Sequence, residues 1–308
     1  MTLSHPKEDE IVKGTSLTRD AWHRLKKNRL AMFSLWFVVG MLILCFVVPA
    51  LPIVKDPNEQ DLTARFLGPS MEHWLGTDQL GRDVFARILY GGQISMMVGL
   101  VATGVAILIG VTYGAIAGYA GGRTDAVMMR IVDTLYAIPF LVLVIVLKVV
   151  IAERLEAKLE WMGRFSNIVP LFVAIGALGW LTLARITRAQ VMAIKEQEFV
   201  EAAVSLGLSR LRILFRHIVP NTLGAAIVYA TLTIPSFILF EASLSYLGVG
   251  IEAPNSSWGI LIKEGADFLE TQVGLLIIPG LFFSLTLFAF NFLGDGLRDA
   301  LDVRASKD

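Results

Sequence analysis

The chain has 308 residues, of which 55% are hydrophobic and 18% charged, and its formal net charge at pH 7 is zero. Soluble domains carry about 25% charged residues, and the shortfall lies in uncharged runs close to the roughly 20 residues that cross a bilayer as a helix. This composition excludes an ordinary soluble enzyme, gives no basic field that would favour nucleic acid as a partner, and predicts an all-α polytopic integral membrane protein.

Six apolar runs predict six transmembrane helices. They lie at about 30–54, 94–120, 131–151, 167–184, 223–244 and 273–293. We therefore expect an N-terminal tail at 1–29, a first transmembrane helix at 30–52, an outer loop with a short helix at 53–93, a membrane domain at 94–297 and a tail at 298–308. The first run is longer than the core of a cleavable signal peptide, which predicts a retained anchor. The lone cysteine, Cys45, lies within it as a small buried hydrophobe.

Lysine and arginine are distributed unevenly between the two sides of these helices. Residues 1–29, 121–130, 185–222 and 296–308 together hold 18 of the 27 basic residues, and the alternate segments hold nine. Cytoplasmic loops carry the excess of basic residues. The count predicts that both termini and residues 185–222 are cytoplasmic.

The outer loop ends in a helical pattern over residues 73–92. Asp78 is placed to cap a short helix, and Gly91 and Gly92 permit a break before the second membrane helix. One face of the short helix would carry Leu80, Val84 and Ile88.

Glycines and prolines mark three of the apolar runs. Gly110, Gly114 and Gly118 repeat every four residues on one face of the second run, a spacing that predicts close packing against another helix. Pro139 and Pro235 lie inside the third and fifth runs and are expected to kink them.

Ionisable residues in or near the membrane are rare and informative. Glu241, toward the outer end of the fifth run, fits a place in a translocation pathway and a structural role equally well. Asp133 and Arg130 are three residues apart and could pair on one helix. Lys148 suits an interfacial position with its amine turned to water, and Asp295 suits the inner end of the sixth run.

The polar segment 185–221 predicts two short amphipathic helices joined at Gly207. Ser209 would cap the second helix and Pro220 would stop it. The residues alone allow a basic helix lying on the lipid surface or an ordered docking element. The expected apolar faces are Phe199, Ala202, Ala203 and Leu206 in the first helix, and Leu208, Leu211, Phe215 and Ile218 in the second.

Several motifs resemble those of ABC importer permeases. Glu201-Ala202-Ala203, then Gly207 and Pro220, resembles the "EAA" loop of that family, although His217 and Val219 stand where Ile and Leu are frequent. The segments GTDQLGRD at 76–83, EASLSYLG at 241–248 and LGDGLRDALD at 293–302 resemble the dipeptide/oligopeptide/nickel class, in its second-permease (C) type. The usual Pro-Arg that follows is replaced here by Val303-Arg304.

This resemblance implies a type I ABC importer permease fold in a bacterial cytoplasmic (inner) membrane, embedded in lipid. It implies that Glu201, Ala202, Ala203, Gly207 and Pro220 couple the chain to ATPase subunits. The implied partners are a second homologous permease subunit, two ABC ATPase subunits and a periplasmic or lipid-anchored solute-binding protein. Short peptides are the first expectation for the substrate, with nickel chelates or antimicrobial peptides as alternatives.

Sequence signatures of enzymes are missing. The chain contains no GxxxxGK[ST] phosphate loop, no HExxH and no GxSxG, so no catalytic, cofactor-binding or metal-binding residue is predicted. ATP hydrolysis is expected in partner subunits. The rival from another class is a secondary transporter driven by an ion gradient, which would favour inverted repeats and midplane carboxylates; neither is evident. A membrane-embedded enzyme is the more distant alternative.

Overall fold

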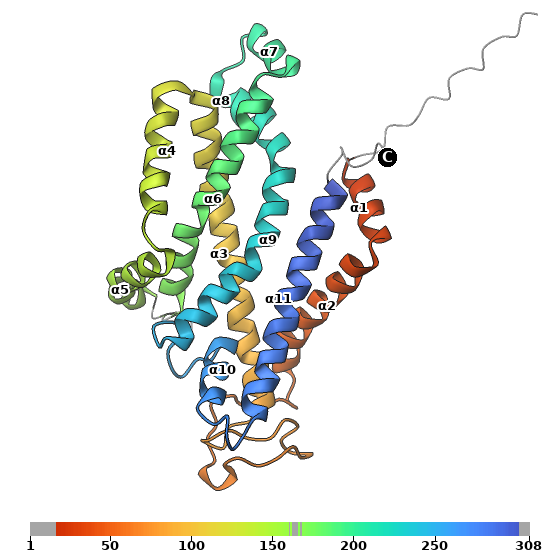
Figure 1. The fold of residues 1–308 in the computed structure, drawn as a ribbon, viewed down its shortest axis with the longest axis vertical. Coiled ribbons are helices and arrows are strands. Elements are labelled where there is room, and N and C mark those ends of the chain that lie inside the picture. The colour runs from red at the N-terminus through yellow and green to blue at the C-terminus, as the bar shows by residue number, and fades with distance from the viewer. Residues whose placement is uncertain (1–16, 160, 162–165, 167, 302–308) are drawn as a thin grey trace, which may run out of the picture.

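The computed structural model describes residues 17–159, 161, 166 and 168–301, and within them the fold is an elongated helical bundle (Figure 1). The described part contains no strand beyond one isolated bridge between Thr77 and Asp83. The tail at 1–16, the expected start of the fourth run at Asn167, and the end of the last motif with Val303-Arg304 lie outside the described residues.

The helices follow in a simple order. They are α1 (Leu17–Lys27), α2 (Arg29–Phe46), α3 (Val84–Ala120), α4 (Gly122–Tyr136), α5 (Phe140–Lys158), α6 (Val169–Lys195), α7 (Glu198–Ser205), α8 (Arg210–Ile213), the π-helical turn η4 (Leu214–Ile218), α9 (Val219–Tyr246), α10 (Trp258–Ala266) and α11 (Gly274–Leu301), with 3₁₀ turns η1 (Val48–Ala50) and η2 (Leu62–Ala64).

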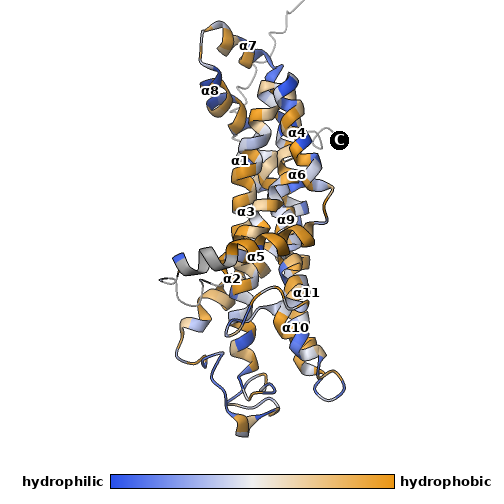
Figure 2. Cartoon of the chain, turned by 90° about the vertical axis from the view of Figure 1, so that its left-hand side faces the viewer, coloured by the Kyte–Doolittle hydropathy of each residue, from blue (hydrophilic) through white to orange (hydrophobic). Residues whose placement is uncertain are grey.

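Among the described residues, five helices are long and apolar enough to cross a membrane, and six if the bent pair α4 and α5 is one span. The predicted all-α, multi-pass fold is confirmed. Figure 2 shows the apolar middle of the bundle between more polar ends.

The third span differs from the continuous kinked helix that the sequence predicted. Helix α4 ends at Tyr136, α5 begins at Phe140, and the two are bent by 92°. Pro139 stands in the break rather than inside a helix. Its ring disfavours helical geometry at Ile138 and it has no N–H to donate, so the chain turns there.

The second span also begins differently, because α3 starts ten residues before the expected Ile94. The cap is Asp83, whose Oδ1 accepts from the Ala86 N–H at 2.8 Å. The predictions of Asp78 as the cap and of a separate short helix were wrong. Asp78 instead pairs with Arg82 and Arg87. Asp83, which directly precedes α3, caps the helix.

Gly91 and Gly92 do not break the chain but let two helices approach α3. A Cβ on Gly92 would come within 2.7 Å of the Trp258 ring. Trp258, the first residue of α10, is fully buried and donates its indole N–H to the Ile88 carbonyl at 3.1 Å. The small residues therefore serve packing rather than a turn.

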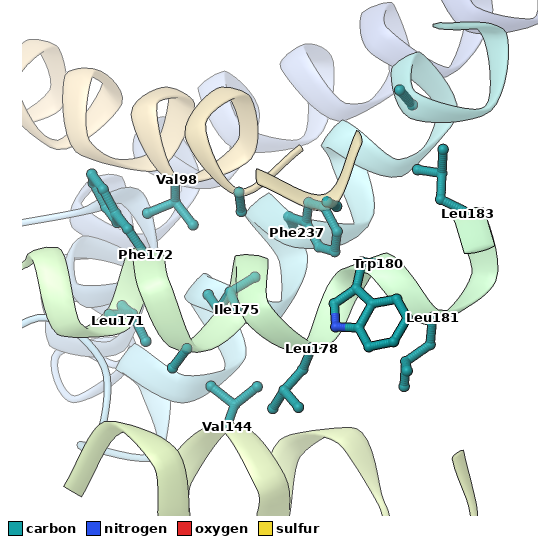
Figure 3. Packing of buried hydrophobic residues seen from close by; sticks show 14 of the residues in the cluster. Val98, Val144, Leu171, Phe172, Ile175, Leu178, Trp180, Leu181, Leu183 and Phe237 are labelled. Atoms are coloured by element: carbon teal, nitrogen blue, oxygen red, sulfur yellow. The ribbon is translucent and has the colours of Figure 1, made fainter. Parts of the chain in front are cut away.

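Helix α6 is the centre of the larger hydrophobic core. It packs along α3 and also contacts α5 and α9. Figure 3 shows Leu178 directed toward Val144 of α5, with Phe237 approaching α6 from α9. Because apolar side chains of α6 are buried against α3, α5 and α9, α6 fixes the positions of these three helices.

A second layer is formed by α2 and α11, with α1 at its end. Leu25, Ala31 and Ala300 pack together, so the described chain ends lie side by side. Figure 1 shows them at the end of the bundle from which α7 projects, whereas the loop at 51–83 and α10 lie at the opposite end. This arrangement agrees with the sidedness that the basic residues predict.

The sidedness is testable by labelling. In a Cys45→Ala background, Ser209→Cys is expected to react only with thiol reagent that reaches the cytoplasm. Met71→Cys, whose position is 96% exposed at the other end, is expected to react from outside intact cells. Reaction of Ser209→Cys from outside would reverse the orientation.

Candidate functional site

Helix α7 and the turn after it form a compact projection. Gly207 has φ +74°, in the left-handed region that favours glycine. The Leu208 N–H reaches the Ala203 carbonyl at 3.2 Å and the Gly207 N–H reaches the Val204 carbonyl at 2.9 Å. These bonds close the C-terminus of α7 in the manner of a glycine cap and fix the joint that the sequence predicted.

The face by which α7 is anchored matches the predicted one only in part: Ala203 is buried as expected, whereas Phe199, Ala202 and Leu206 are exposed. Val200 and Ala203 are buried and pack against Ile213, Leu214 and Ile218. Ala202 and Glu201 are exposed. The tight turn at Gly207 places the segment 210–218 against Val200 and Ala203. A helical wheel treats α7 as an isolated helix and therefore cannot predict which side this segment covers.

Exposed apolar side chains without a partner in the described chain flank the buried face of this projection. Leu206 is 80% exposed and Leu211 is 69% exposed. We call this surface the tip patch; it consists of Phe199, Val204, Leu206, Leu211 and Phe215. Apolar surface of this kind marks contact sites for proteins or membranes.

The second short helix is also corrected by the structure. Pro220 does not stop it, because helical structure continues from Arg210 to Tyr246 and Pro220 lies in the first turn of α9. The π turn at Leu214–Ile218 precedes it, and such a widened turn accommodates a proline that donates no hydrogen bond. Ser209 is at the N-cap position but makes no side-chain cap bond.

The extra residue in the π turn shifts the buried face. Leu211 and Phe215, predicted to be on the apolar inner face, are exposed, while Ile213 and Leu214 are buried.

Three glycines place α3 against the backbone of α6. A Cβ on Gly110 would lie 2.7 Å from the Leu183 Cβ, and one on Gly118 would lie 2.7 Å from the Arg188 carbonyl oxygen. At Gly114 the added atom would collide with the Ala184 carbonyl. The repeat lies along the contact between these two helices, which leaves no room for a side chain.

Helix α4 is attached to α6 by ion pairs. Asp125 receives two bonds from Arg188, each of 2.5 Å, and Asp133 receives one from Arg185 at 2.7 Å. The predicted partner of Asp133, Arg130, is not the one observed, because the Arg185 guanidinium reaches it from the neighbouring helix. Two arginines of the segment next to α7 thus hold α4.

Glu241 is fully buried between three helices. Its oxygens accept from Ser95 of α3 at 2.9 Å and from Ser245 of α9 at 2.7 Å. The Ser95 hydroxyl also accepts from the backbone N–H of Trp258 at 3.2 Å, which adds α10 to the network. A satisfied buried polar network of this kind fixes helix positions, and these contacts favour the structural role for Glu241.

A group of charged residues lies at the end of the bundle opposite α7. Asp78 Oδ2 accepts from Arg82 and from Arg87, each at 2.7 Å, and Glu264 of α10 pairs with both arginines. The side chains of Asp78 and Arg87 are only 6% and 4% exposed. The GTDQLGRD motif therefore joins the loop, α3 and α10. On the exposed surface of the loop, the hydrogen bond and charge of Lys55 lower the pKa of Glu72.

Lys148 is not the interfacial lysine that the sequence predicted. Its Nζ donates to the Val249 carbonyl at 3.1 Å, the Gly250 carbonyl at 2.7 Å and Glu252 at 2.9 Å. The bend between α4 and α5 brings this residue to the loop after α9. Lys148 therefore attaches α5 to that loop.

Several of these positions carried no sequence prediction. Trp258, Glu264 and the whole of α10 were assigned to a loop, although Ser257 gives a capping signal, since its side chain accepts from the Ile260 N–H. No group of three His, Cys, Asp or Glu residues that could hold a metal ion occurs in the part of the chain that the structure describes.

The fold and its projecting end define a multi-pass membrane protein of the transport permease type. Residues 110–307 match the family described as binding-protein-dependent transport system inner membrane component, and residues 16–69 match the N-terminal transmembrane domain of oligopeptide transport permease C. The chain belongs to the family of binding-protein-dependent transport system inner membrane components. These are permeases of ABC importers rather than enzymes, with ATPase and binding-protein partners.

Curated relatives cover almost the full chain. The oligopeptide transport system permease protein OppC of Escherichia coli (strain K12) is 45% identical over 98% of this chain and 96% of its own length. The dipeptide transport system permease protein DppC of Bacillus subtilis (strain 168) is 44% identical over 97% and 90%. A probable D,D-dipeptide transport system permease protein of E. coli (strain K12) is 37% identical over 91% and 90%.

The glycine contact predicts a position-dependent effect within α3. Gly114→Leu should prevent α3 from approaching α6 and should abolish stable insertion or assembly, measured by the yield of monodisperse complex in detergent. Gly104→Leu is the matched control, since a Cβ at Gly104 meets nothing within 4 Å. Equal yields from the two variants would contradict a role of this contact.

The ion pairs that Asp78 and Glu264 form with Arg82 and Arg87 predict an effect on thermal stability. Asp78→Ala leaves two arginines with one carboxylate, and loss of one partner of a buried pair costs about 3–5 kcal/mol. The purified protein should therefore melt at a lower temperature. Glu59→Ala, an exposed carboxylate of the same loop, should leave the melting temperature unchanged. An unchanged melting temperature for Asp78→Ala would show that the pairs do not stabilise the fold.

Proposed function

We propose that this chain forms half of the translocation pathway of an ATP-driven importer of short peptides in a bacterial cytoplasmic membrane. A second homologous permease subunit supplies the other half, two ATPase subunits bind at the cytoplasmic end, and a periplasmic or lipid-anchored solute-binding protein delivers the peptide outside. The near full-length similarity to oligopeptide and dipeptide permeases supports the choice of peptides. It gives no support to a nickel chelate, an antimicrobial peptide or an ion-driven transporter.

The single observation that carries the coupling role is the tip patch. Helices α7 and α8 lie at the same end of the bundle as the described chain ends (Figure 1). Leu206, at the C-cap of α7, and Leu211 of α8 have no partner within the described chain that would shield them from water. Exposed leucines on an ordered projection fit a groove of another protein. A helix resting on lipid is the alternative, but α7 projects beyond the apolar middle of the bundle (Figure 2).

The connection from the tip patch to the membrane is short. Val200 and Ala203 of α7 pack on the start of the helix that continues into α9, and Ala115 of α3 belongs to the same hydrophobic cluster. A push on α7 would therefore act on α3 and α9 together. Glu201, Ala202 and Gly207 stand on the outward side or at the joint, where they can meet an ATPase, and Pro220 belongs to the first turn of α9.

The tip patch predicts loss of ATPase binding without loss of folding. Leu206→Asp should remove ATPase subunits from the purified complex, because a charge replaces an apolar side chain that the permease itself does not bury. The matched control is Leu62→Asp, 64% exposed at the opposite end, which should retain them. Full ATPase binding and transport in Leu206→Asp would exclude the tip patch as the docking surface.

Glu201 and Gly207 test coupling separately from docking. Glu201→Lys reverses an exposed charge, and Gly207→Val puts a branched side chain at φ +74°. In liposomes, both variants should assemble with all subunits yet lose peptide transport and substrate-stimulated ATP hydrolysis. If either variant only changes which peptides are accepted, the segment selects substrate and does not couple.

A further inference from the structure

A cavity of about 390 Å³ lies at the corner between α4 and α5. Its lining comes from both helices and from α6 and α9, so four segments meet there. We call it the corner cavity; its main walls are Pro139, Phe140, Leu178, Leu181, Phe237 and Phe240. In Figure 3, Leu178 and Leu181 lie on the side of α6 turned toward α5, and Phe237 lies on the side toward α9.

The lining is apolar with a few hydroxyl groups. Thr182, Thr233 and Ser236 are the hydroxyl residues besides Tyr136. The Thr182 and Tyr136 hydroxyls bond each other at 2.5 Å, and Thr233 donates to its own helix. Ser236 is exposed. Such a mixture, with aromatic and aliphatic walls and a small number of polar groups, is typical of sites for small organic ligands.

The corner cavity adjoins an exposed ion pair. Arg185 and Asp133 form an ion pair whose side chains are 42% and 59% exposed. Arg185 also lies 4.1 Å from the ring centre of Tyr136, a residue of the cavity lining. An exposed ion pair next to a membrane-spanning segment is stable where water or protein reaches it, and costs free energy against hydrocarbon.

We propose that the corner cavity receives an aliphatic or aromatic side chain of a peptide during its passage. The inference rests on the proposed peptide transport and names the class of side chain for which this subunit provides a site. The cavity is more than large enough to take a Leu or Phe side chain, and its walls contain no charged residue. Peptides with apolar side chains therefore gain contacts here that peptides with acidic side chains lack.

The first measurement is photo-crosslinking in the complete complex with its ATPases and binding protein, in liposomes. The probe is a tripeptide, Ala-X-Ala, whose middle residue is benzoylphenylalanine. The expected adducts lie on Phe140, Leu178 or Phe240, and excess Ala-Phe-Ala should suppress them. Adducts formed only elsewhere, or cavity adducts formed only by a photoactivatable lipid, would overturn the proposal while peptide transport stands.

The second measurement fills the cavity. Ser236→Phe should lower transport of Ala-Phe-Ala about tenfold relative to Ala-Ala-Ala, the scale expected when one apolar side chain loses its burial. Ser236→Ala should keep the preference for Ala-Phe-Ala. Leu239→Phe, on the same helix but 51% exposed and outside the lining, should behave like the parent.

Failure of the proposed function and failure of the corner cavity as a side-chain site give different experimental results. If the parent complex moves no peptide although all subunits are present, the proposed function falls and this inference falls with it. If the parent moves peptides and Ser236→Phe reduces all tripeptides equally, or none, then the corner cavity is not a side-chain site although the chain still serves peptide import. The affinity of the isolated binding protein for each tripeptide is measured separately. Its own preference can then be subtracted from the transport preference of the complex.

Discussion

The contact between α3 and α6 is the constraint on which the rest of the structure depends. Gly110, Gly114 and Gly118 bring the two backbones together so closely that an added Cβ would collide with main-chain or Cβ atoms of α6. Membrane helices gain little from excluding lipid, so dispersion contacts of this closeness are a main source of their association. With α3 and α6 joined, α9 and α5 pack on the pair, and Arg185 and Arg188 of α6 hold α4.

This central pair also connects the two ends of the protein. At the end opposite α7, α3 begins at a capped turn and joins α10 through the Asp78, Arg87 and Glu264 group and through Trp258. At the other end, Ala115 of α3 and Val191 of α6 belong to the hydrophobic cluster that supports α7. The tip patch therefore stands on a hydrophobic cluster to which both α3 and α6 contribute. This is the physical basis for α7 as a lever instead of a loose connection.

The sequence predicted features that depend on local chemistry and failed where distant segments decide. Apolar run length predicted the spans, and Gly207 marked the joint because a positive φ suits glycine. Lys148 and Asp133 were given solvent or a local partner, whereas their real partners lie 104 and 52 positions away. For Lys148 the bend at Pro139 was needed first, and no periodicity reveals a 92° change of direction. The buried face of α7 was misassigned because the turn at Gly207 places the following segment under it, and that of the second segment because the π turn at Leu214–Ile218 alters the helical register.

The central claim is that α7 and the α3–α6 pair move as one body when the ATPases bind ATP. Electron paramagnetic resonance distances in the full complex test it, with spin labels at Ser205 of α7, which is exposed and outside the tip patch, and at Leu108 of α3, in a Cys45→Ala background. The expected result is the same narrow distance distribution between these two positions with and without ATP, while the distance from Ser205 to Phe288 of α11 changes. A change between Ser205 and Leu108 with no change toward Phe288 would mean that α7 moves alone, and would contradict a common movement of α7 and the α3–α6 pair.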